Sequence, residues 1–181
     1  MPNRKRTVLS VDDDETNQLV MTSFLEGAGF EVIQIYSGQE CLDHLENSFS
    51  SQNTDEIPDL VLLDVMMPGI DGFETCHQIR LRFPATLPII MVSAKISLSE
   101  KIKALSFALA NDYLTKPFDR ALMLAKIEAR ITLSEAIRDT ASSMTRPSVN
   151  LAFENACFQS LTDRLKKAKE FRLEFAHRLE H

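Results

Sequence analysis

The feature that most constrains the fold is a short apolar run, Leu60–Leu63, that ends in the carboxylate of Asp64. Pro58 precedes the run, and Pro68-Gly69 follows shortly after Asp64 and favours a turn. A run this short is typical of a strand that is buried on both faces, as in a parallel sheet. Open α/β sheets bind their ligands at the carboxyl ends of such strands. The sequence therefore predicts that Asp64 belongs to a functional site.

A second pair of carboxylates, Asp12 and Asp13, ends another apolar run, Thr7–Val11. If the two strands are neighbours, three carboxylates come together at one edge of the sheet. Like charges at close range raise one another's pKa, so such a cluster needs a cation to stay ionised. Mg²⁺ prefers hard oxygen ligands and keeps several waters, so a few carboxylates suffice. The spacing thus predicts a magnesium site with a nucleophilic aspartate.

Strand and helix signals alternate through the first two thirds of the chain. This alternation predicts an α/β fold with a doubly wound, five-stranded parallel sheet and right-handed crossovers. The expected strands are Thr7–Val11, Glu31–Ile35, Leu60–Leu63, Pro88–Val92 and Asp112–Leu114. The expected helices between them are Thr16–Glu26, Gly38–Asn47, Gly72–Arg82 and Ser99–Ala108, with a polar loop over Ser48–Glu56. The apolar face of the first helix is expected to consist of Leu19, Val20, Phe24 and Leu25.

The pattern changes after Lys116-Pro117-Phe118, where no further strand signal appears. Asp119 can cap a helix that runs as far as Met144, and a heptad-like seam from Phe158 to Leu179 predicts another helix. We therefore expect a domain over residues 5–130 and a helical extension over residues 131–181. The extension is interpreted as a linker or as a small output or dimerisation segment, so a homodimer through the C-terminal helices is expected.

Composition excludes several classes of protein. The formal net charge of −6 disfavours a protein that coats nucleic acid, and no stretch has the length of a membrane span. We therefore expect neither nucleic acid nor a membrane as a partner. Cys41, Cys76 and Cys157 match no zinc spacing and are expected to be reduced thiols. These features favour a cytoplasmic protein.

Two further polar residues follow the remaining predicted strands. Ser93 comes after the fourth strand and Lys116 after the fifth. A phosphoryl group spreads its charge over its equatorial oxygens, so a metal ion, an ammonium and a hydroxyl can each bind one of them. In that arrangement Asp64 would attack phosphorus and become an acyl phosphate.

These motifs, in this order, resemble the receiver domain of bacterial two-component response regulators over roughly residues 5–130. The segments that carry the resemblance are Val11–Asp14, Leu63–Gly72, Val92–Ala94 and Tyr113–Phe118. The resemblance implies a flavodoxin-like receiver fold in which Asp64 accepts a phosphoryl group, assisted by Lys116 and Ser93. The donor would be a sensor histidine kinase or a phosphotransfer protein of the phosphorelay.

The resemblance also implies a metal site and a switch. Mg²⁺ would be held by Asp13 and Asp64 directly, by Asp12 through water, and by the carbonyl of Met66. After phosphorylation Ser93 would move toward the phosphoryl group and Tyr113 would turn inward, which would change the surface that a protein effector reads. The Lys116-Pro117 peptide bond would be cis.

One departure from the family lies on the switching face. The family usually has a glycine near position 109, where this chain reads Phe107-Ala108-Leu109-Ala110-Asn111. The turn before the fifth strand is therefore expected to be built differently.

Two other functions remain open. Asp12-x-Asp14-x-Thr16 also fits a phosphatase of the haloacid-dehalogenase type, although Asp64 then has no role and no later acidic pair appears. The second is a scaffold that keeps the fold without being phosphorylated. The preferred reading is a signalling protein whose catalysis is limited to its own phosphorylation and dephosphorylation.

Overall fold

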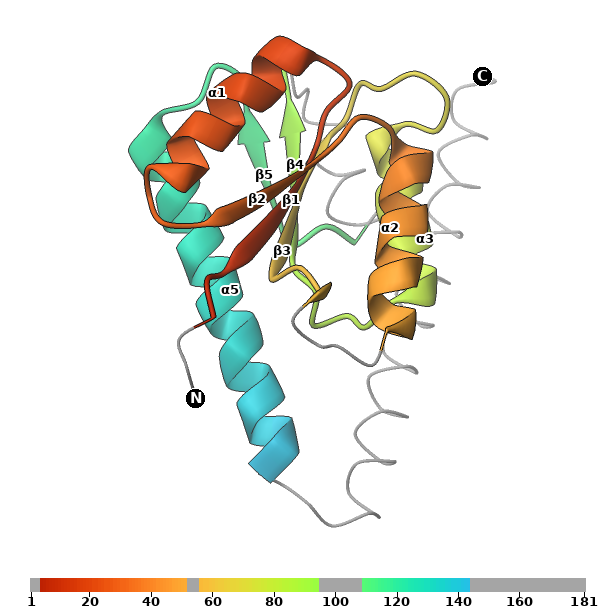
Figure 1. Cartoon of the computed structure of the whole chain (residues 1–181), viewed down its shortest axis with the longest axis vertical. Helices are drawn as coiled ribbons and strands as arrows, with labels where there is room; N and C mark the ends of the chain where they lie inside the picture. Colours follow the sequence, from red (N-terminus) through yellow and green to blue (C-terminus); the bar gives the residue numbers. More distant parts are fainter. Residues whose placement is uncertain (1–3, 52–55, 95–108, 144–181) are drawn as a thin grey trace, which may run out of the picture. The chain divides into compact units, whose positions relative to one another are not determined.

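The computed structural model describes residues 4–51, 56–94 and 109–143. Five parallel strands form one sheet in the order β2-β1-β3-β4-β5 (Figure 1). The strands are β1 (Thr7–Val11), β2 (Glu31–Ile35), β3 (Leu60–Asp64), β4 (Ile89–Ser93) and β5 (Asp112–Thr115). The helices are α1 (Glu15–Glu26), α2 (Gly38–Ser50), α3 (Gly72–Arg82) and α5 (Arg120–Ser143).

This architecture confirms the predicted doubly wound α/β fold, and each predicted strand is present with ends that differ by at most one residue. The helix expected over Ser99–Ala108 and the seam from Phe158 to Leu179 lie outside the described residues. One loop boundary is wrong, because α2 continues to Ser50. The Ser48 hydroxyl donates to the carbonyl of His44 one turn earlier (2.9 Å), so this polar residue is accommodated within the helix.

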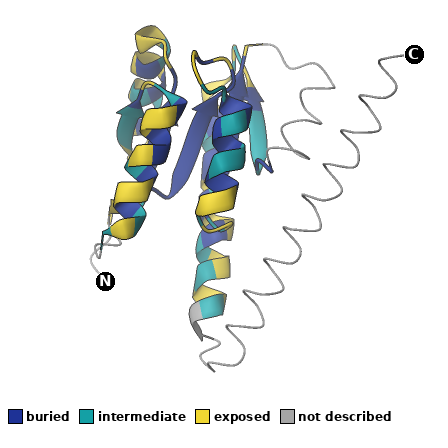
Figure 2. Ribbon diagram, turned by 90° about the vertical axis from the view of Figure 1, so that its right-hand side faces the viewer, coloured by how far each residue is buried: buried dark blue, intermediate teal, exposed yellow. Residues whose placement is uncertain are grey.

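Each face of the sheet is covered by a pair of helices that pack on their own apolar core (Figure 1). α2 and α3 cover one face through Cys41, Leu42, Leu45, Phe73 and Ile79. α1 and α5 cover the other through Met21, Leu25, Met123, Ile127 and Ile131. Figure 2 shows that the middle strands are buried, whereas the helices also carry exposed residues. β1, β3 and β4 are buried along their whole length, as expected for strands with helices on both sides.

The predicted apolar face of α1 is wrong in part. Leu25 is buried, but Leu19 is 68% exposed and Val20 is 46% exposed. The buried positions are instead Gln18, Met21 and Leu25. Gln18 is buried on this face because its amide binds backbone carbonyls of β1 and β2, which apolar periodicity does not reveal.

The turn before β5 contains a residue in a conformation that favours glycine. Leu109 adopts a left-handed backbone with φ of 58°. Its side chain is buried, and its carbonyl accepts a hydrogen bond from Nε of Arg80 (3.1 Å). A buried leucine is thus held in a conformation that normally costs an L-residue about 1–2 kcal/mol.

The chain divides into two compact units, Met1–Glu135 and Ala136–His181. Both apolar cores described above lie within the first unit. In the described part of the chain, no helix combines the length and the apolar character needed to cross a bilayer. Cys41 and Cys76 are buried thiols that form no disulfide within the described residues, as predicted, whereas Cys157 lies outside those residues.

Candidate functional site

The site lies at the carboxyl edge of the sheet, where β1 and β3 are neighbours. Val11 pairs with Leu63 in the parallel register, so Asp12 and Asp64 follow paired residues on adjacent strands. The chain leaves β1 through α1, on one face of the sheet, and leaves β3 through α3, on the other. Such a reversal opens a crevice between the two strand ends, which is the general ligand position in open α/β sheets.

Lys116 joins the two carboxylates. Its Nζ donates to Oδ2 of Asp12 (2.6 Å) and to Oδ1 of Asp64 (2.7 Å). Both aspartate side chains are only 8% exposed. Lys116 follows directly after β5, and the Lys116-Pro117 peptide bond is cis, as the resemblance implies. The structure thus brings three of the predicted site residues into direct contact.

The charges in this contact do not cancel, because two carboxylates face one ammonium. Burial raises the pKa of Asp64, and the hydrogen bond from Lys116 opposes this only in part. Burial tends to lower the pKa of Lys116, but its hydrogen bonds to Asp12 and Asp64 outweigh burial, and the pKa is raised. The site therefore holds excess negative charge and an ammonium that stays protonated.

Backbone groups fix the other oxygen of each carboxylate. The amide N–H of Met66 donates to Oδ2 of Asp64 (2.7 Å), and that of Asp14 donates to Oδ1 of Asp12 (3.0 Å). Asp14 is itself the N-cap of α1 and accepts from the amides of Thr16 and Asn17. These bonds lower the pKa of the Asp14 carboxyl. The loop after each strand therefore orients the acid that the strand ends on.

A close approach by α3 also positions Asp64. A Cβ atom added to Gly72 would lie 2.0 Å from the Asp64 carbonyl oxygen and 2.8 Å from the Val65 Cα. Only glycine leaves room for the backbone of β3 at this point. The first turn of α3, capped by Asp71, thus packs directly on the segment that carries Asp64.

The remaining predicted residues occupy different positions. Ser93 is buried at the end of β4, one residue beyond Val92, which pairs with Asp64. Tyr113 is half-buried in β5, where Nζ of Lys126 lies 5.7 Å from its ring centroid. Asp13 is exposed, and the side chain of Met66 is 73% exposed.

The sequence also predicts that three carboxylates come together, and the structure brings two of them into contact through Lys116. Within the described ranges, no set of three or more His, Cys, Asp or Glu side chains has the geometry of a metal site. Two buried carboxylates at one strand edge nevertheless suit Mg²⁺, because this ion is commonly held by one or two carboxylates together with phosphate oxygens and waters. The donors present therefore fit magnesium.

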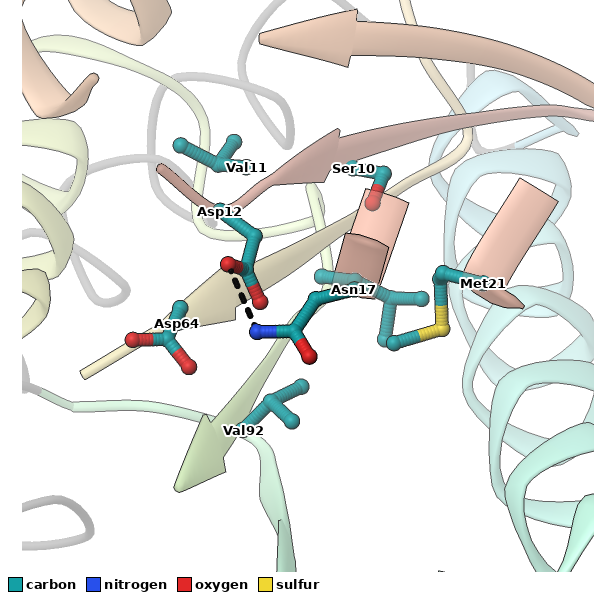
Figure 3. Close-up of a pocket in the computed structure, with 8 residues that line it drawn as sticks. Ser10, Val11, Asp12, Asn17, Met21, Asp64 and Val92 are labelled. Carbon is teal, nitrogen blue, oxygen red and sulfur yellow. Dashed lines mark hydrogen bonds between the residues drawn. The ribbon is translucent and has the colours of Figure 1, made fainter. Parts of the chain in front are cut away.

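Sequence reasoning missed two amides at the start of α1. Nδ2 of Asn17 donates to Oδ1 of Asp12 (3.1 Å), as Figure 3 shows, and Nε2 of Gln18 lies 3.2 Å from the Asp12 carbonyl. Their spacing from Asp12 was the available signal, because residues in the first turns of a helix that follows an acidic loop can reach back to that loop.

Comparison with known proteins agrees with this geometry. Residues 8–128 match the response regulator receiver domain family. The chain is similar to the structure of a putative response regulator from Chloroflexus aurantiacus, with 36% identity and a TM-score of 0.61, over 71% of this chain and 98% of that one. It is also similar to a CheY-like receiver domain protein from Methanospirillum hungatei, with 28% identity and a TM-score of 0.63, over 73% and 98%.

A third similar structure is the BeF3-activated N-terminal receiver domain of RstA from Klebsiella pneumoniae. It shares 25% identity and a TM-score of 0.61, over 70% of this chain and 98% of that chain. The matched segment covers most of the chain, the whole site and all of both cores except Ile131. The chain belongs to the response regulator receiver domain family, a class of signalling modules of two-component systems.

Proposed function

We propose that this protein accepts a phosphoryl group on Asp64 from a histidine kinase or a phosphotransfer protein, in a reaction that depends on Mg²⁺. The observation that carries the proposal is the contact of Lys116 with both Asp12 and Asp64 at the carboxyl edge of the sheet. Family membership supports the same reaction. The receiver would occupy residues 5–130, and the protein would catalyse only its own phosphorylation and dephosphorylation.

The proposed step is a transfer of PO3 between two residues. An oxygen of Asp64 forms a bond to phosphorus while the bond from phosphorus to the histidine ring nitrogen breaks. The electron pair returns to that nitrogen, and the donor leaves as neutral imidazole because its other ring nitrogen carries a proton. Lys116 exchanges its bond to Oδ1 of Asp64 for a bond to a phosphoryl oxygen, and the hydroxyl of Ser93 donates to another.

Magnesium would be held by Asp12, Asp13, Asp64 and the Met66 carbonyl. When bound, it would neutralise charge that develops on the phosphoryl oxygens. The excess of carboxylate over ammonium in the site favours such a cation. Ser93 and Tyr113 would then act as the switch: Ser93 draws toward the phosphoryl group, and Tyr113 turns toward the space that it leaves.

A small phosphodonor tests the acceptor. The protein is incubated with acetyl phosphate and Mg²⁺, and the modified residue is located by mass spectrometry. We expect one phosphoryl group on Asp64, none in Asp64→Asn, and normal modification in the control Asp43→Asn, which changes an exposed carboxylate on α2. Modification confined to Asp12 would instead indicate the phosphatase chemistry.

We also propose that α5 mediates self-association and that a protein effector reads the resulting surface. Leu122 and Leu133 are 52% and 53% exposed on this helix, and exposed Ala129 lies between them at heptad-like spacing. Leu133→Glu should abolish dimers in sedimentation experiments, whereas Leu81→Glu, at a leucine of α3 that is 54% exposed, should not. A monomer in both phosphorylation states would contradict the proposal.

A further inference from the structure

The Asp12 carboxylate is held by three donors, and one of them has no assigned role. Lys116 binds Oδ2, while the backbone N–H of Asp14 and the side-chain amide of Asn17 bind Oδ1. Asn17 is half-buried in α1 and lines the pocket beneath the two acids, together with Asp12, Asp64, Met21 and Val92 (Figure 3). In the part of the chain that the structure describes, it is the one side-chain amide that donates to either acid.

We propose that Asn17 is a positioning residue that keeps the Asp12 carboxylate aimed into the site. This inference rests on the proposed function, because it concerns the Mg²⁺ site to which Asp12 would belong. In the structure, Lys116 is the sole hydrogen-bond donor to Oδ2 of Asp12 among the described residues. Without Lys116, a single backbone N–H and Asn17 would remain to hold this side chain.

The geometry suits this role because Asn17 is neutral. A second ammonium at its position would cancel the charge that attracts Mg²⁺, and a carboxylate would repel Asp12. An amide N–H restricts the carboxylate while leaving its charge available. Partners of metal-binding side chains generally act in this way, by fixing the orientation of the group that faces the ion.

Gln18 holds the backbone of the same residue. Its Nε2 lies 3.0 Å from the Ser10 carbonyl, 3.2 Å from that of Asp12 and 2.8 Å from that of Ile35. This buried amide therefore anchors the start of α1 against the ends of β1 and β2. Asn17 therefore approaches Asp12 from a helix whose first turn is bonded to the strand ends, and its hydrogen bond constrains the Asp12 side chain.

Isothermal titration with Mg²⁺ alone, and then with beryllofluoride and Mg²⁺, tests the proposal on the full chain. Asn17→Leu removes the donor and keeps the approximate size, and Asn17→Ala is a second variant with high helix propensity. We expect both to weaken Mg²⁺ binding roughly tenfold, the lower end of the range for partners of metal ligands. Asn47→Leu, which changes an exposed asparagine of α2, should bind as the wild type does.

A double-mutant comparison separates positioning from a structural effect. If Asn17 acts through Asp12, Asn17→Leu should weaken Mg²⁺ binding in the wild type and have no further effect in Asp12→Asn. An equal loss in both backgrounds would overturn the proposal, and so would unchanged Mg²⁺ affinity accompanied only by a lower urea midpoint. If the wild type bound neither Mg²⁺ nor beryllofluoride, the proposed function would fail, and this inference with it. A wild type that binds both, with Asn17 variants equal to it, would refute the inference alone.

Discussion

Asp12 and Asp64 contribute two negative charges to a buried space in which Lys116 provides one positive charge. The structure therefore keeps a carboxylate where its charge is poorly solvated, and burial raises the pKa of Asp64 accordingly. A carboxyl with a raised pKa destabilises the folded protein once it is ionised. This cost is absent below the ordinary pKa of 3.8 and grows as the pH rises through that value.

Asp64→Asn should consequently stabilise the magnesium-free protein at neutral pH. We expect its free energy of unfolding in urea to rise by about 0.5–2 kcal/mol, the usual size of such gains, and the gain to vanish below pH 3.8. Added Mg²⁺ should stabilise the wild type more than the variant, because binding to the folded state adds to stability. A variant that is less stable than the wild type without Mg²⁺ would contradict this account of the charges.

Leu109 carries a conformational cost of a different kind, since its left-handed backbone suits glycine. Leu109→Ala and Leu109→Gly both remove the buried side chain, so their difference isolates the backbone. We expect the glycine variant to be more stable than the alanine variant by about 1–2 kcal/mol in urea unfolding. At exposed Ala129 in α5, replacement by glycine should have the opposite effect and destabilise by about 1 kcal/mol.

At the scale of elements, the contact between α3 and β3 controls where Asp64 lies. Gly72→Ala should lower the free energy of unfolding by about 1–3 kcal/mol, because the added Cβ meets backbone atoms that cannot rotate away. It should also slow phosphorylation, since β3 must move to relieve the overlap. Gly27→Ala provides the comparison: Gly27 has φ of −63°, and a Cβ there would lie 2.9 Å from a side-chain nitrogen of Arg120 and 3.0 Å from the Ser23 carbonyl oxygen, so its overlap with backbone is much smaller. Equal effects at both sites would argue against a special role for the α3 contact.

Asp112 of β5 connects this strand to α5 through side-chain contacts. Its carboxylate accepts from Lys126 (2.7 Å) and Arg130 (3.0 Å), and also from the N–H of Tyr113 (2.8 Å). Burial tends to raise the pKa of Asp112, but these hydrogen bonds outweigh it, and the pKa is lowered. The ionised Asp112 carboxylate therefore stabilises the folded protein above the ordinary pKa of 3.8. This stabilisation is lost as the pH falls through the lowered pKa of Asp112 in the folded state.

Asp112→Asn should thus destabilise the protein at pH 7 by roughly 1 kcal/mol, as measured by urea unfolding. The difference from the wild type should shrink as the pH falls below 3.8, where the wild-type carboxylate becomes protonated. A difference that persisted unchanged under those acidic conditions would show that packing around Asp112, and not its charge, maintains this contact.

At the scale of the whole molecule, Ile131 is the last core residue among those that the structure describes, and the first compact unit ends at Glu135. Arg6, near the start of this unit, donates to the carboxylate of Glu135 through both Nε (3.1 Å) and a terminal nitrogen (2.8 Å). A chain that ends at Ser143, the last residue of α5, keeps the described parts of both cores and the ion pair of Arg6 with Glu135, so we expect it to unfold in urea with a single cooperative transition. A broad change with no cooperative step would contradict this expectation.

The amino-acid sequence by itself determined the strands, the parallel fold class and the presence of Asp12, Asp64 and Lys116 at strand ends. The sequence predicts these features because they are local. A short apolar run indicates a buried strand, and the polar residue directly after the run indicates a position at the edge of the sheet. The resemblance added the cis bond before Pro117, and the structure contains it.

The tertiary structure decided which of these residues meet and which unpredicted ones join them. The register of β1 with β3 places Asp12 beside Asp64, while Asp13, the next residue, is exposed. The anchoring of Gln18 turns α1 so that Leu19 and Val20 are exposed and Asn17 reaches Asp12. Apolar periodicity does not reveal this, because Gln18 is a polar residue that is buried through hydrogen bonds to the carbonyls of Ser10, Asp12 and Ile35. In a parallel sheet those carbonyls become neighbours only after the chain has folded.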